Sequence, residues 1–449
     1  MAFRRTMCAL GATALTGALI MATAPAASAD QTRRDQWALE TLQAESAWKI
    51  SKGEGVTVAV IDTGVNAEHV DLRNNVLKGK DFIDGDEDAS PDSTEEQPSH
   101  GTGMASVIAG HGHGPGLADG VMGLAPEAKI LPIRVNLEGN SGFADEIRYA
   151  VDNGASIINI SMILQSSQYK DSASAEDLEA IAYALDKDVL IVAGAGNDGK
   201  DGDLPFPANS PGVVAVGGVD KTGNFWEGSN YGPEVLLTAP ATRIVSAGWP
   251  GNKLRISDGT SDSTAYVSAA AALLRSKFPD LTAGQIANRL VKTAVLPESA
   301  KGLALPDEKY GYGAIRPLAA LTEDIPTGSK YGPLRAPGTE GSSAAPSAGK
   351  SDTDYAAENE ESDQKQLIFF VVLGFIALAV VGLIVFLIVK LSRRNKNRTG
   401  GSGGPVGYPP YGQQSVSPQQ NPYQQSVSPQ QNPYQQQSTP PHGQWPPQQ

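Results

Sequence analysis

The sequence contains almost no cysteine: one of its 449 residues is cysteine, Cys8, and it lies in an apolar segment near the N-terminus. The rest of the chain therefore has no disulfide bond, no thiolate zinc site and no cysteine nucleophile. Positive charge is also scarce, because 35 Lys and Arg residues oppose 49 Asp and Glu residues and leave a formal net charge of −14. This balance argues against a nucleic-acid-binding protein.

Long apolar runs are also few, and the first lies at the N-terminus. Arg4 and Arg5 precede an apolar run that ends at about Ala24, and the small residues 27–29 follow it. A basic start, a short apolar stretch and small residues before a cleavage point are typical of a secretory signal peptide, which we place at residues 1–29. An uncleaved anchor is the alternative, but the run is short and ends in an Ala-x-Ala pattern.

Residues 367–389 form the second apolar run, which has 23 residues and no charge. At about 1.5 Å per residue, a helix of this length spans roughly 34 Å, enough to cross a hydrocarbon core of about 30 Å. Acidic residues precede the run, and Lys390, Arg393 and Arg394 follow it. The positive-inside rule then places residues 30–366 outside the cell membrane. We expect a single-pass membrane protein with an extracytoplasmic domain and a cytoplasmic tail.

Residues 30–321 have the composition of a globular α/β domain. Runs rich in Val and Ile predict buried strands, and amphipathic stretches between them predict helices. Strands of this kind that alternate with helices are typical of a parallel sheet covered on both faces, so we expect a doubly wound sheet. The predicted strands are residues 55–62, 129–134, 156–161, 188–194 and 213–219, and the predicted helices are residues 100–110, 143–154 and 174–188.

The regions on either side of the predicted span have a different composition. Residues 322–366 are rich in Pro, Gly, Ser, Ala and acidic residues, which predicts a flexible stalk. Residues 390–449 are first basic and then rich in Gln and Pro, and the sequence QQSVSPQQNPY occurs there twice. This composition cannot build a core, so we expect a disordered cytoplasmic tail. A docking role for the tail and an inert tail both remain open.

Three polar residues stand at the ends of predicted elements. Asp62 ends the first strand, His100 begins a helix, and Ser261 begins another. In open parallel sheets the reactive crevice lies at the carboxyl ends of strands and the starts of helices. A serine hydroxyl becomes a nucleophile when an imidazole removes its proton and a carboxylate orients that imidazole. Taken singly, Asp62 also suits a turn, and His100 and Ser261 also suit helix N-caps.

The motifs that contain these residues occur together and in one order. They are VAVIDTGV, HGTGMASVIAG and DGTS before an alanine-rich helix. In these motifs the sequence resembles the subtilisin-like serine proteases, or subtilases, over nearly all of residues 37–321. The resemblance implies a subtilisin-like fold and peptide-bond hydrolysis without a cofactor. It also implies that Asp62 orients the imidazole, His100 acts as the base and acid, and Ser261 is the nucleophile.

The same resemblance implies roles for residues around the nucleophile. Asn197, in VAGAGNDG, matches the asparagine whose amide stabilises the oxyanion. Substrate is expected to bind as an extended strand between the segments at Ser141-Gly142 and Ser161. Ile163 stands where the family usually has glycine, and we hypothesise that it narrows the primary specificity pocket.

The order of segments also resembles the mycosins, which are membrane-anchored subtilases associated with type VII secretion. A short leader, an exported catalytic domain, a Pro-rich stalk, one C-terminal span and a basic tail carry this resemblance. It implies secretion-complex proteins as partners. The sequence differs at residues 262–265, Asp-Ser-Thr-Ala, where the family reads roughly Met-Ala-Ala-Pro. This difference motivates the rival hypothesis of a slow or non-catalytic, subtilase-shaped scaffold.

No motif in the sequence specifies a metal site. The acidic run from Asp84 to Glu96 has the oxygen ligands that Ca²⁺ prefers, but its spacing fits no EF-hand, so a solvated loop is the simpler interpretation. His111 and His113 lack carboxylate or cysteine partners at ligand spacing, and we expect them in a surface loop. Bound structural Ca²⁺ remains open.

Overall fold

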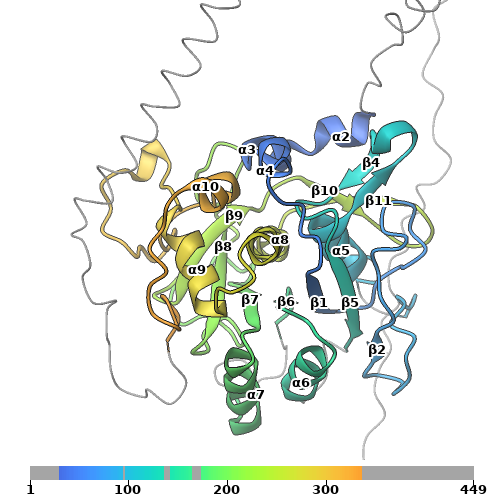
Figure 1. Cartoon of the computed structure of the whole chain (residues 1–449), viewed down its shortest axis with the longest axis horizontal. Helices are drawn as coiled ribbons and strands as arrows, with labels where there is room; N and C mark the ends of the chain where they lie inside the picture. Colours follow the sequence, from blue (N-terminus) through green and yellow to red (C-terminus); the bar gives the residue numbers. More distant parts are fainter. Residues whose placement is uncertain (1–29, 95–96, 136–141, 164–172, 336–449) are drawn as a thin grey trace, which may run out of the picture. The chain divides into compact units, whose positions relative to one another are not determined.

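A parallel β-sheet of seven strands forms the centre of the fold in the computed structural model (Figure 1). The structure describes residues 30–94, 97–135, 142–163 and 173–335, which belong to one compact unit. The strand order is β2-β5-β1-β6-β7-β8-β9, and neighbouring strands are parallel throughout. The strands are β1 (Thr57–Asp62), β2 (Lys80–Asp81), β5 (Lys129–Arg134), β6 (Ile157–Ile160), β7 (Leu190–Gly194), β8 (Val213–Val219) and β9 (Val235–Pro240).

The five strands predicted from apolar runs are present as β1, β5, β6, β7 and β8. Their continuous apolar character follows from burial on both faces of the sheet. In β1, Val58 and Val60 pack into the core that contains α5 (His100–Ala109) and α8 (Thr260–Lys277). Ala59 and Ile61 pack into a second core, which contains α6 (Ala144–Asp152) and α7 (Ala175–Asp186). The predicted α/β fold with a parallel sheet is therefore confirmed.

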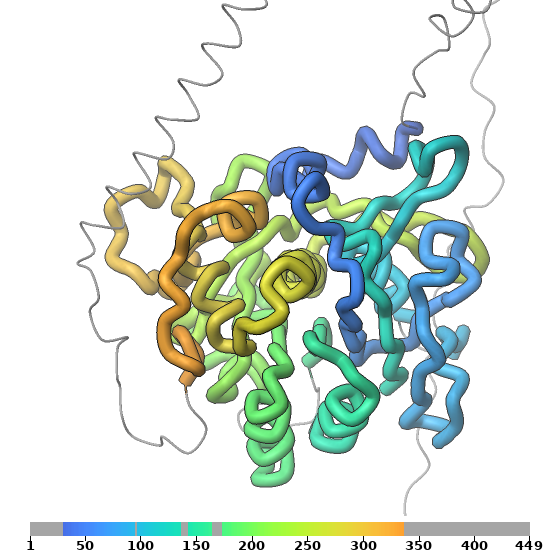
Figure 2. The backbone as a smooth tube through the Cα atoms, in the orientation of Figure 1, coloured from blue at the N-terminus to red at the C-terminus, as the bar shows by residue number. Residues whose placement is uncertain are grey.

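Helices cover both faces of the sheet (Figures 1 and 2). The N-terminal helices lie beside α10, although α10 comes near the end of the described residues. One face carries α5 (His100–Ala109), α8 (Thr260–Lys277), α9 (Ala283–Lys292), α10 (Pro317–Thr322) and the short helices α2 (Gln31–Asp35), α3 (Trp37–Thr41) and α4 (Ala44–Ala47), and the other face carries α6 (Ala144–Asp152) and α7 (Ala175–Asp186).

Two antiparallel hairpins add to this framework. In the first, β3 (His111–His113) pairs with β4 (Asp119–Met122), and in the second, β10 (Ile244–Ala247) pairs with β11 (Leu254–Ser257). Short 3₁₀ turns lie at Pro115–Leu117 and Glu298–Ala300. The predicted surface loop at His111 and His113 is therefore a short strand, because its backbone pairs with β4.

Helix α8 runs through the middle of the domain, and every residue from 260 to 274 is buried. Its alanines allow close packing against the sheet, and its buried hydroxyl groups find acceptors there. Ser263 donates a hydrogen bond to the Ala239 carbonyl at 3.0 Å, and Ser268 donates one to the Asn159 side chain at 3.0 Å. These bonds tie α8 to β9 and β6, so the start of α8 is held firmly at the carboxyl end of the sheet.

The packed domain continues past the predicted boundary at residue 321. Leu334 is 7% exposed and belongs to the main core. The guanidinium of Arg289, on α9, donates hydrogen bonds to the carbonyls of Ala320 at 2.9 Å and Glu323 at 2.7 Å. Residues 323–335 show no apolar periodicity, and side chain–backbone hydrogen bonds help to hold them in the domain. The predicted stalk at residues 322–366 therefore overlaps the domain.

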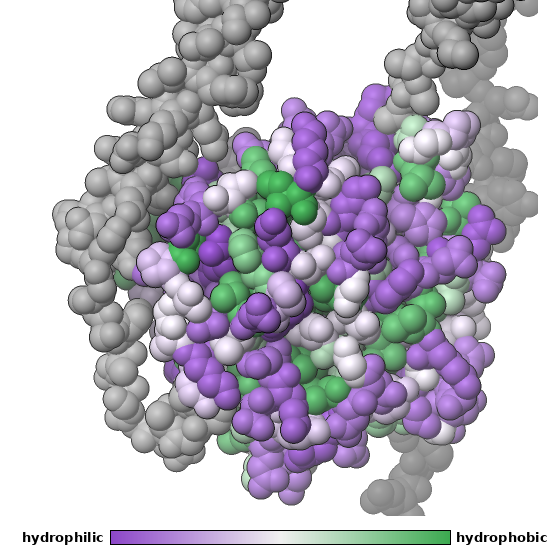
Figure 3. All heavy atoms as spheres, in the orientation of Figure 1, coloured by the Kyte–Doolittle hydropathy of each residue, from purple (hydrophilic) through white to green (hydrophobic). Residues whose placement is uncertain are grey.

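Several predictions fall on residues outside the described ranges. These are the signal peptide at 1–29, the span at 367–389 and the tail at 390–449. Among the residues that the structure describes, no helix is long and apolar enough to cross a membrane. The face of the domain seen in Figure 3 is mostly hydrophilic, with apolar side chains in small separate groups.

Candidate active site

The candidate site lies at the carboxyl end of β1, where the strand order reverses. The chain passes from β1 to β5 on one side and later returns to β6 on the other. A crevice opens at such a switch point because the following connections leave on opposite sides of the sheet. Asp62 is the last residue of β1, His100 the first of α5, and Ser261 the second of α8.

Asp62 and His100 are in direct contact. The Nδ1 atom of His100 lies 2.8 Å from Oδ1 and 3.0 Å from Oδ2 of Asp62, whose side chain is fully buried. Asp62 Oδ1 also accepts a hydrogen bond from the Thr63 backbone N–H at 2.8 Å. Because a carboxylate accepts, this contact assigns the proton of the neutral imidazole to Nδ1. Nε2 is then free to act as a base.

Ser261 points toward a neighbouring carbonyl in this structure. Its hydroxyl donates to the Ser161 carbonyl at 3.0 Å, and the Ser161 hydroxyl donates in return to the Ser261 carbonyl at 3.1 Å. Within the described ranges, His100 Nε2 makes no hydrogen bond to Ser261. Contacts of this kind are often loose without substrate, and rotation about the Ser261 Cα–Cβ bond reorients the hydroxyl.

His100 and Ser261 open onto the same cleft, which has a volume of about 190 Å³. The cleft combines an imidazole, a hydroxyl and a carboxamide with small residues that let a peptide backbone approach. It is lined by Gln97, His100, Ser161, Met162, Ile163, Gly194, Gly196, Asn197, Thr260 and Ser261.

The orientation of the Asn197 amide is set by Thr260. Asn197 Oδ1 accepts hydrogen bonds from the Thr260 backbone N–H at 2.8 Å and from its hydroxyl at 2.9 Å. The carbonyl end of the amide is thus occupied, and Nδ2 is left as a donor at the cleft. Asn197 Nδ2 and the backbone N of Ser261 each lie 3.7 Å from the point where a Cβ on Gly259 would stand. Asp262 Oδ2 lies at the same distance from this point, so two nitrogen donors and one carboxylate oxygen surround one small space beside Ser261.

Comparisons with known proteins identify the family of this chain. The model of the subtilase family, Peptidase_S8, matches residues 53–313, which contain all three catalytic candidates. The chain belongs to the subtilase family. It is a subtilisin-like serine protease related to the mycosins of type VII secretion.

The relatives include curated mycosins and solved structures. The chain is 32% identical to mycosin-1 of Mycolicibacterium smegmatis over 355 residues, which cover 67% of this chain and 75% of mycosin-1. It is 31% identical to the crystal structure of MycP1 from the ESX-1 type VII secretion system, with a TM-score of 0.56 and coverage of 70% and 91%. It also matches a chain in the periplasmic assembly of the ESX-5 inner membrane complex, at 31% identity, a TM-score of 0.54 and coverage of 66% and 85%.

Ile163 projects over the floor of the cleft in this subtilase. Its Cδ1 atom lies 3.0 Å from the point where a Cβ on Gly196 would stand. Gly196 has a φ of +105°, a left-handed conformation that favours glycine. The Asn230 amide lies even closer to this point than Ile163 does, so the space above the Gly196 backbone is already filled by these two side chains.

The other predicted substrate-binding residues have structural contacts. The Ser161 hydroxyl accepts a hydrogen bond from Asn159 at 2.9 Å and donates one to the Ser261 carbonyl, so it holds the backbone at Ser261. Gly142 lies against the Asp177 carboxylate, which occupies the space that a side chain would need. Ser141 lies outside the described residues. Direct contact of these residues with substrate stays a prediction.

Sequence analysis missed the hydrogen-bonded chain behind Ser261. Ser268 donates to Asn159, Asn159 donates to Ser161, and Ser161 donates to the Ser261 carbonyl. The signal in the sequence was a polar residue inside an apolar run, since Asn159 interrupts a buried strand and Ser268 an alanine-rich helix. Buried polar groups of this kind need partners, so their presence indicates a network.

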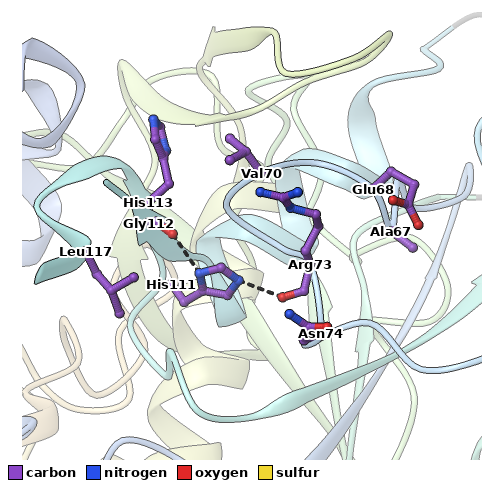
Figure 4. A pocket seen from close by; sticks show the side chains of 9 residues that line it. All are labelled: Ala67, Glu68, Val70, Arg73, Asn74, His111, Gly112, His113 and Leu117. Carbon is purple, nitrogen blue, oxygen red and sulfur yellow. Dashed lines mark hydrogen bonds between the residues drawn. The ribbon is translucent and has the colours of Figure 1, made fainter. Parts of the chain in front are cut away.

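A larger cleft, of about 420 Å³, lies away from the catalytic candidates (Figure 4). Both ring nitrogens of His111 face carbonyl oxygens, those of Gly112 at 2.7 Å and Arg73 at 2.8 Å. His113 Nδ1 lies 2.6 Å from Asp71 Oδ1. Neither imidazole has a hydroxyl nucleophile beside it among the lining residues, so this cleft does not carry the protease chemistry.

The acidic loop that begins at Asp84 uses its carboxylates locally. Asp86, Asp88 and Asp92 each accept a hydrogen bond from a backbone N–H two residues later. In the part of the chain that the structure describes, no group of three or more His, Cys, Asp or Glu residues is arranged to hold a metal ion. The interpretation of this segment as a solvated loop stays a prediction.

Proposed function

We propose that Asp62, His100 and Ser261 form the catalytic triad of a membrane-anchored, extracytoplasmic serine endopeptidase. The observation that carries this proposal is the Asp62–His100 contact at 2.8 Å, which leaves Nε2 free at the cleft that Ser261 also lines. A scaffold without catalysis has no physical need for this arrangement.

In the proposed reaction, the Ser261 hydroxyl turns from the Ser161 carbonyl toward His100. Nε2 takes the hydroxyl proton while Oγ attacks the peptide carbonyl, and the same proton then passes to the leaving amine. The buried Asp62 carboxylate stabilises the imidazolium that forms between these steps. Water repeats the sequence to release the acyl group from Ser261.

The negative charge on the tetrahedral intermediate needs donors that are already in place. We propose Asn197 Nδ2 and the Ser261 backbone N–H, because they flank the same space. Thr260 supports this role, since its two hydrogen bonds to Asn197 Oδ1 prevent the amide from turning over.

The cleft favours substrates with a small side chain before the scissile bond. Ile163 and Gly196 both line the cleft, and the branched side chain of Ile163 takes up room that a glycine at position 163 would leave free. Peptide substrates with alanine at this position are therefore expected to be cleaved faster than those with phenylalanine.

The membrane and partner assignments rest on sequence and similarity. Residues 367–389 are proposed to anchor the domain, and the similarity to mycosins supports association with a type VII secretion complex. Extraction of membranes with alkaline carbonate checks the anchor: the full chain stays in the membrane fraction, and a variant without residues 367–389 is released. Co-purification of the full chain with secretion-complex proteins from its own membrane tests the association.

A fluorophosphonate probe, which reacts with activated serines, tests the triad directly. The full-length protein is expected to label on one serine, and Ser261→Ala to abolish labelling. Ser263→Ala is the matched control, because Ser263 lies on the same helix but donates its hydroxyl to the Ala239 carbonyl. A folded wild type that does not label contradicts the protease proposal and favours the scaffold.

A further inference from the structure

The loop that carries Asn197 is held by one buried side chain from another part of the chain. Asn230 is 5% exposed, and its Oδ1 atom accepts hydrogen bonds from the backbone N–H groups of Asp198 and Lys200, both at 3.0 Å. The backbone N–H of Asn230 donates to the Gly196 carbonyl at 2.9 Å. These three bonds hold the loop on both sides of Asn197.

The Asn230 amide also packs directly on the backbone of this loop. Its Nδ2 atom lies so close to Gly196 that a Cβ at that position would collide with it. Gly196 has a φ of +105°, a backbone conformation that favours glycine. The amide and the backbone at residue 196 are therefore in close contact, and the loop has little freedom to shift toward Asn230.

Asn230 is in turn connected to the central sheet. The fully buried Ser229 hydroxyl donates to the Asn230 carbonyl at 2.9 Å and accepts from the backbone N–H of Gly218, on β8, at 3.1 Å. On the other side of Asn230, the backbone N–H of Tyr231 donates to the Lys200 carbonyl at 3.0 Å. Through Asn230 the loop is thus fixed to a strand of the core.

The loop and Thr260 place different parts of Asn197. Thr260 holds the side-chain oxygen, whereas the loop decides where the backbone of Asn197 lies. A hydrogen-bond donor stabilises an oxyanion only when it already lies at the right distance, so a small displacement of the backbone weakens the donor. The contacts of Asn230 are the ones that oppose such a displacement.

We propose that Asn230 is a positioning residue, which fixes residues 196–200 and so holds Asn197 Nδ2 beside the cleft before charge develops on the substrate. This inference rests on the proposed function, with Asn197 as an oxyanion donor. Without the Asn230 acceptor, the backbone N–H groups of residues 198 and 200 lose their partner, and the loop moves to find another. The loss then falls on the transition state rather than on substrate binding.

Steady-state kinetics of the full-length protein on a peptide with alanine before the scissile bond tests this role. Asn230→Ala and Asn230→Leu both remove the acceptor, and leucine keeps the space filled. Each is expected to lower kcat by about 10- to 100-fold and to change KM by less than about 3-fold. Because Asn230 acts through Asn197, neither variant should lose more than Asn197→Leu does.

A double-mutant cycle separates positioning from a merely structural role. In a protein that already carries Asn197→Leu, the donor is gone, so Asn230→Ala should lower kcat by less than about 2-fold further. A residue that only stabilises the fold would cause the same loss in both backgrounds. The unfolding midpoint of every variant is measured beside its kinetics, so that only folded protein is compared.

Asn75→Ala is the matched control. Asn75 is 6% exposed, and its amide donates to the carbonyls of Ala109 and Pro126, both at 2.8 Å. The substitution also removes two buried side chain–backbone hydrogen bonds, but at the end of α5 opposite His100. It should lower the unfolding midpoint and leave kcat within about 2-fold of the wild type.

Several outcomes overturn the inference and leave the triad intact. They are equal losses of kcat in the two backgrounds, a change confined to KM, and an Asn230→Leu variant that keeps the wild-type kcat. A folded wild type that neither cleaves the peptide nor labels with the fluorophosphonate probe overturns the proposed function, and this inference with it.

Discussion

Glu146, in the first turn of α6, is a buried acid whose ionisation should destabilise the protein. Its side chain lies on the core side of the helix, and the residue is 8% exposed. Burial raises the pKa of Glu146 from its ordinary 4.5 to about 7, and the negative charges of Asp145 and Asp177 act in the same direction. A hydrogen bond from the Glu146 backbone N–H to the carboxylate lowers the pKa, but this effect is smaller than that of burial.

The size of the effect follows from the two pKa values. The unfolded chain releases this proton near pH 4.5, and the folded chain releases it near pH 7. Because the folded state binds the proton more tightly, stability falls as the pH rises through this window. At about 1.4 kcal/mol per pH unit, the ionised side chain costs roughly 3 kcal/mol above pH 7. Because Glu146 lies in the first helical turn, the helix dipole stabilises its ionised form, but only by a few tenths to about 1 kcal/mol.

Glu146→Gln removes the charge and keeps the shape. We expect the variant to be more stable than the wild type at pH 8 by about 2–3 kcal/mol, and this advantage to fall below about 1 kcal/mol at pH 5. Urea-induced unfolding followed by tryptophan fluorescence at both pH values measures the difference. Glu176→Gln is the control, because Glu176 also lies in the first turn of a helix, α7, but is exposed.

Two results would refute this reasoning. An advantage of equal size at pH 5 and pH 8 would mean that the stabilisation does not come from the charge. A variant less stable than the wild type at pH 8 would mean that the ionised carboxylate is compensated in the folded state.

Two further predictions concern the cleft. Asn197→Leu should lower kcat about 10²- to 10³-fold with little change in KM, which is the range measured for the equivalent donor in a subtilisin. Thr260→Val should lower kcat less, because the backbone N–H of residue 260 still holds the Asn197 amide. Steady-state kinetics on one peptide substrate checks both, and an equal loss in the two variants would contradict the oxyanion role. Ile163→Gly should raise kcat/KM for phenylalanine before the scissile bond relative to alanine by about 10-fold or more. A preference for large aromatic residues already in the wild type would show that Ile163 does not narrow the pocket.

The fold was largely predictable because each strand can be recognised from a short run of apolar residues. Residues 129–134 and 213–219 have the same bounds as β5 and β8, since runs of apolar residues buried on both faces are unambiguous. The β10–β11 hairpin was not predicted, because Leu254 and Ile256 point to solvent and Arg255 points inward. The strand thus exposes its apolar side chains and turns its polar ones inward, which is the reverse of the usual alternation. Only its packing against α5 and α8 explains this reversal.

The sequence by itself determined which candidate catalytic groups exist and which ends of strands and helices carry them. Asp62 and His100 are 38 residues apart, and the sequence separation alone does not bring them together. The parallel α/β fold does, because the carboxyl end of β1 and the start of α5 lie at the same edge of the sheet.

Only the tertiary structure decided the direction of each side chain. It turned the Ser261 hydroxyl to the Ser161 carbonyl, the Asn197 amide to the cleft, and the Asp262 carboxylate to Ser257. The sequence shows Asp262 only as a change of residue beside the nucleophile. Its direction depends on Ser257 of β11, which precedes the helix that carries Asp262. Side-chain direction is set by long-range packing, whereas strand and helix formation is set mainly by local periodicity.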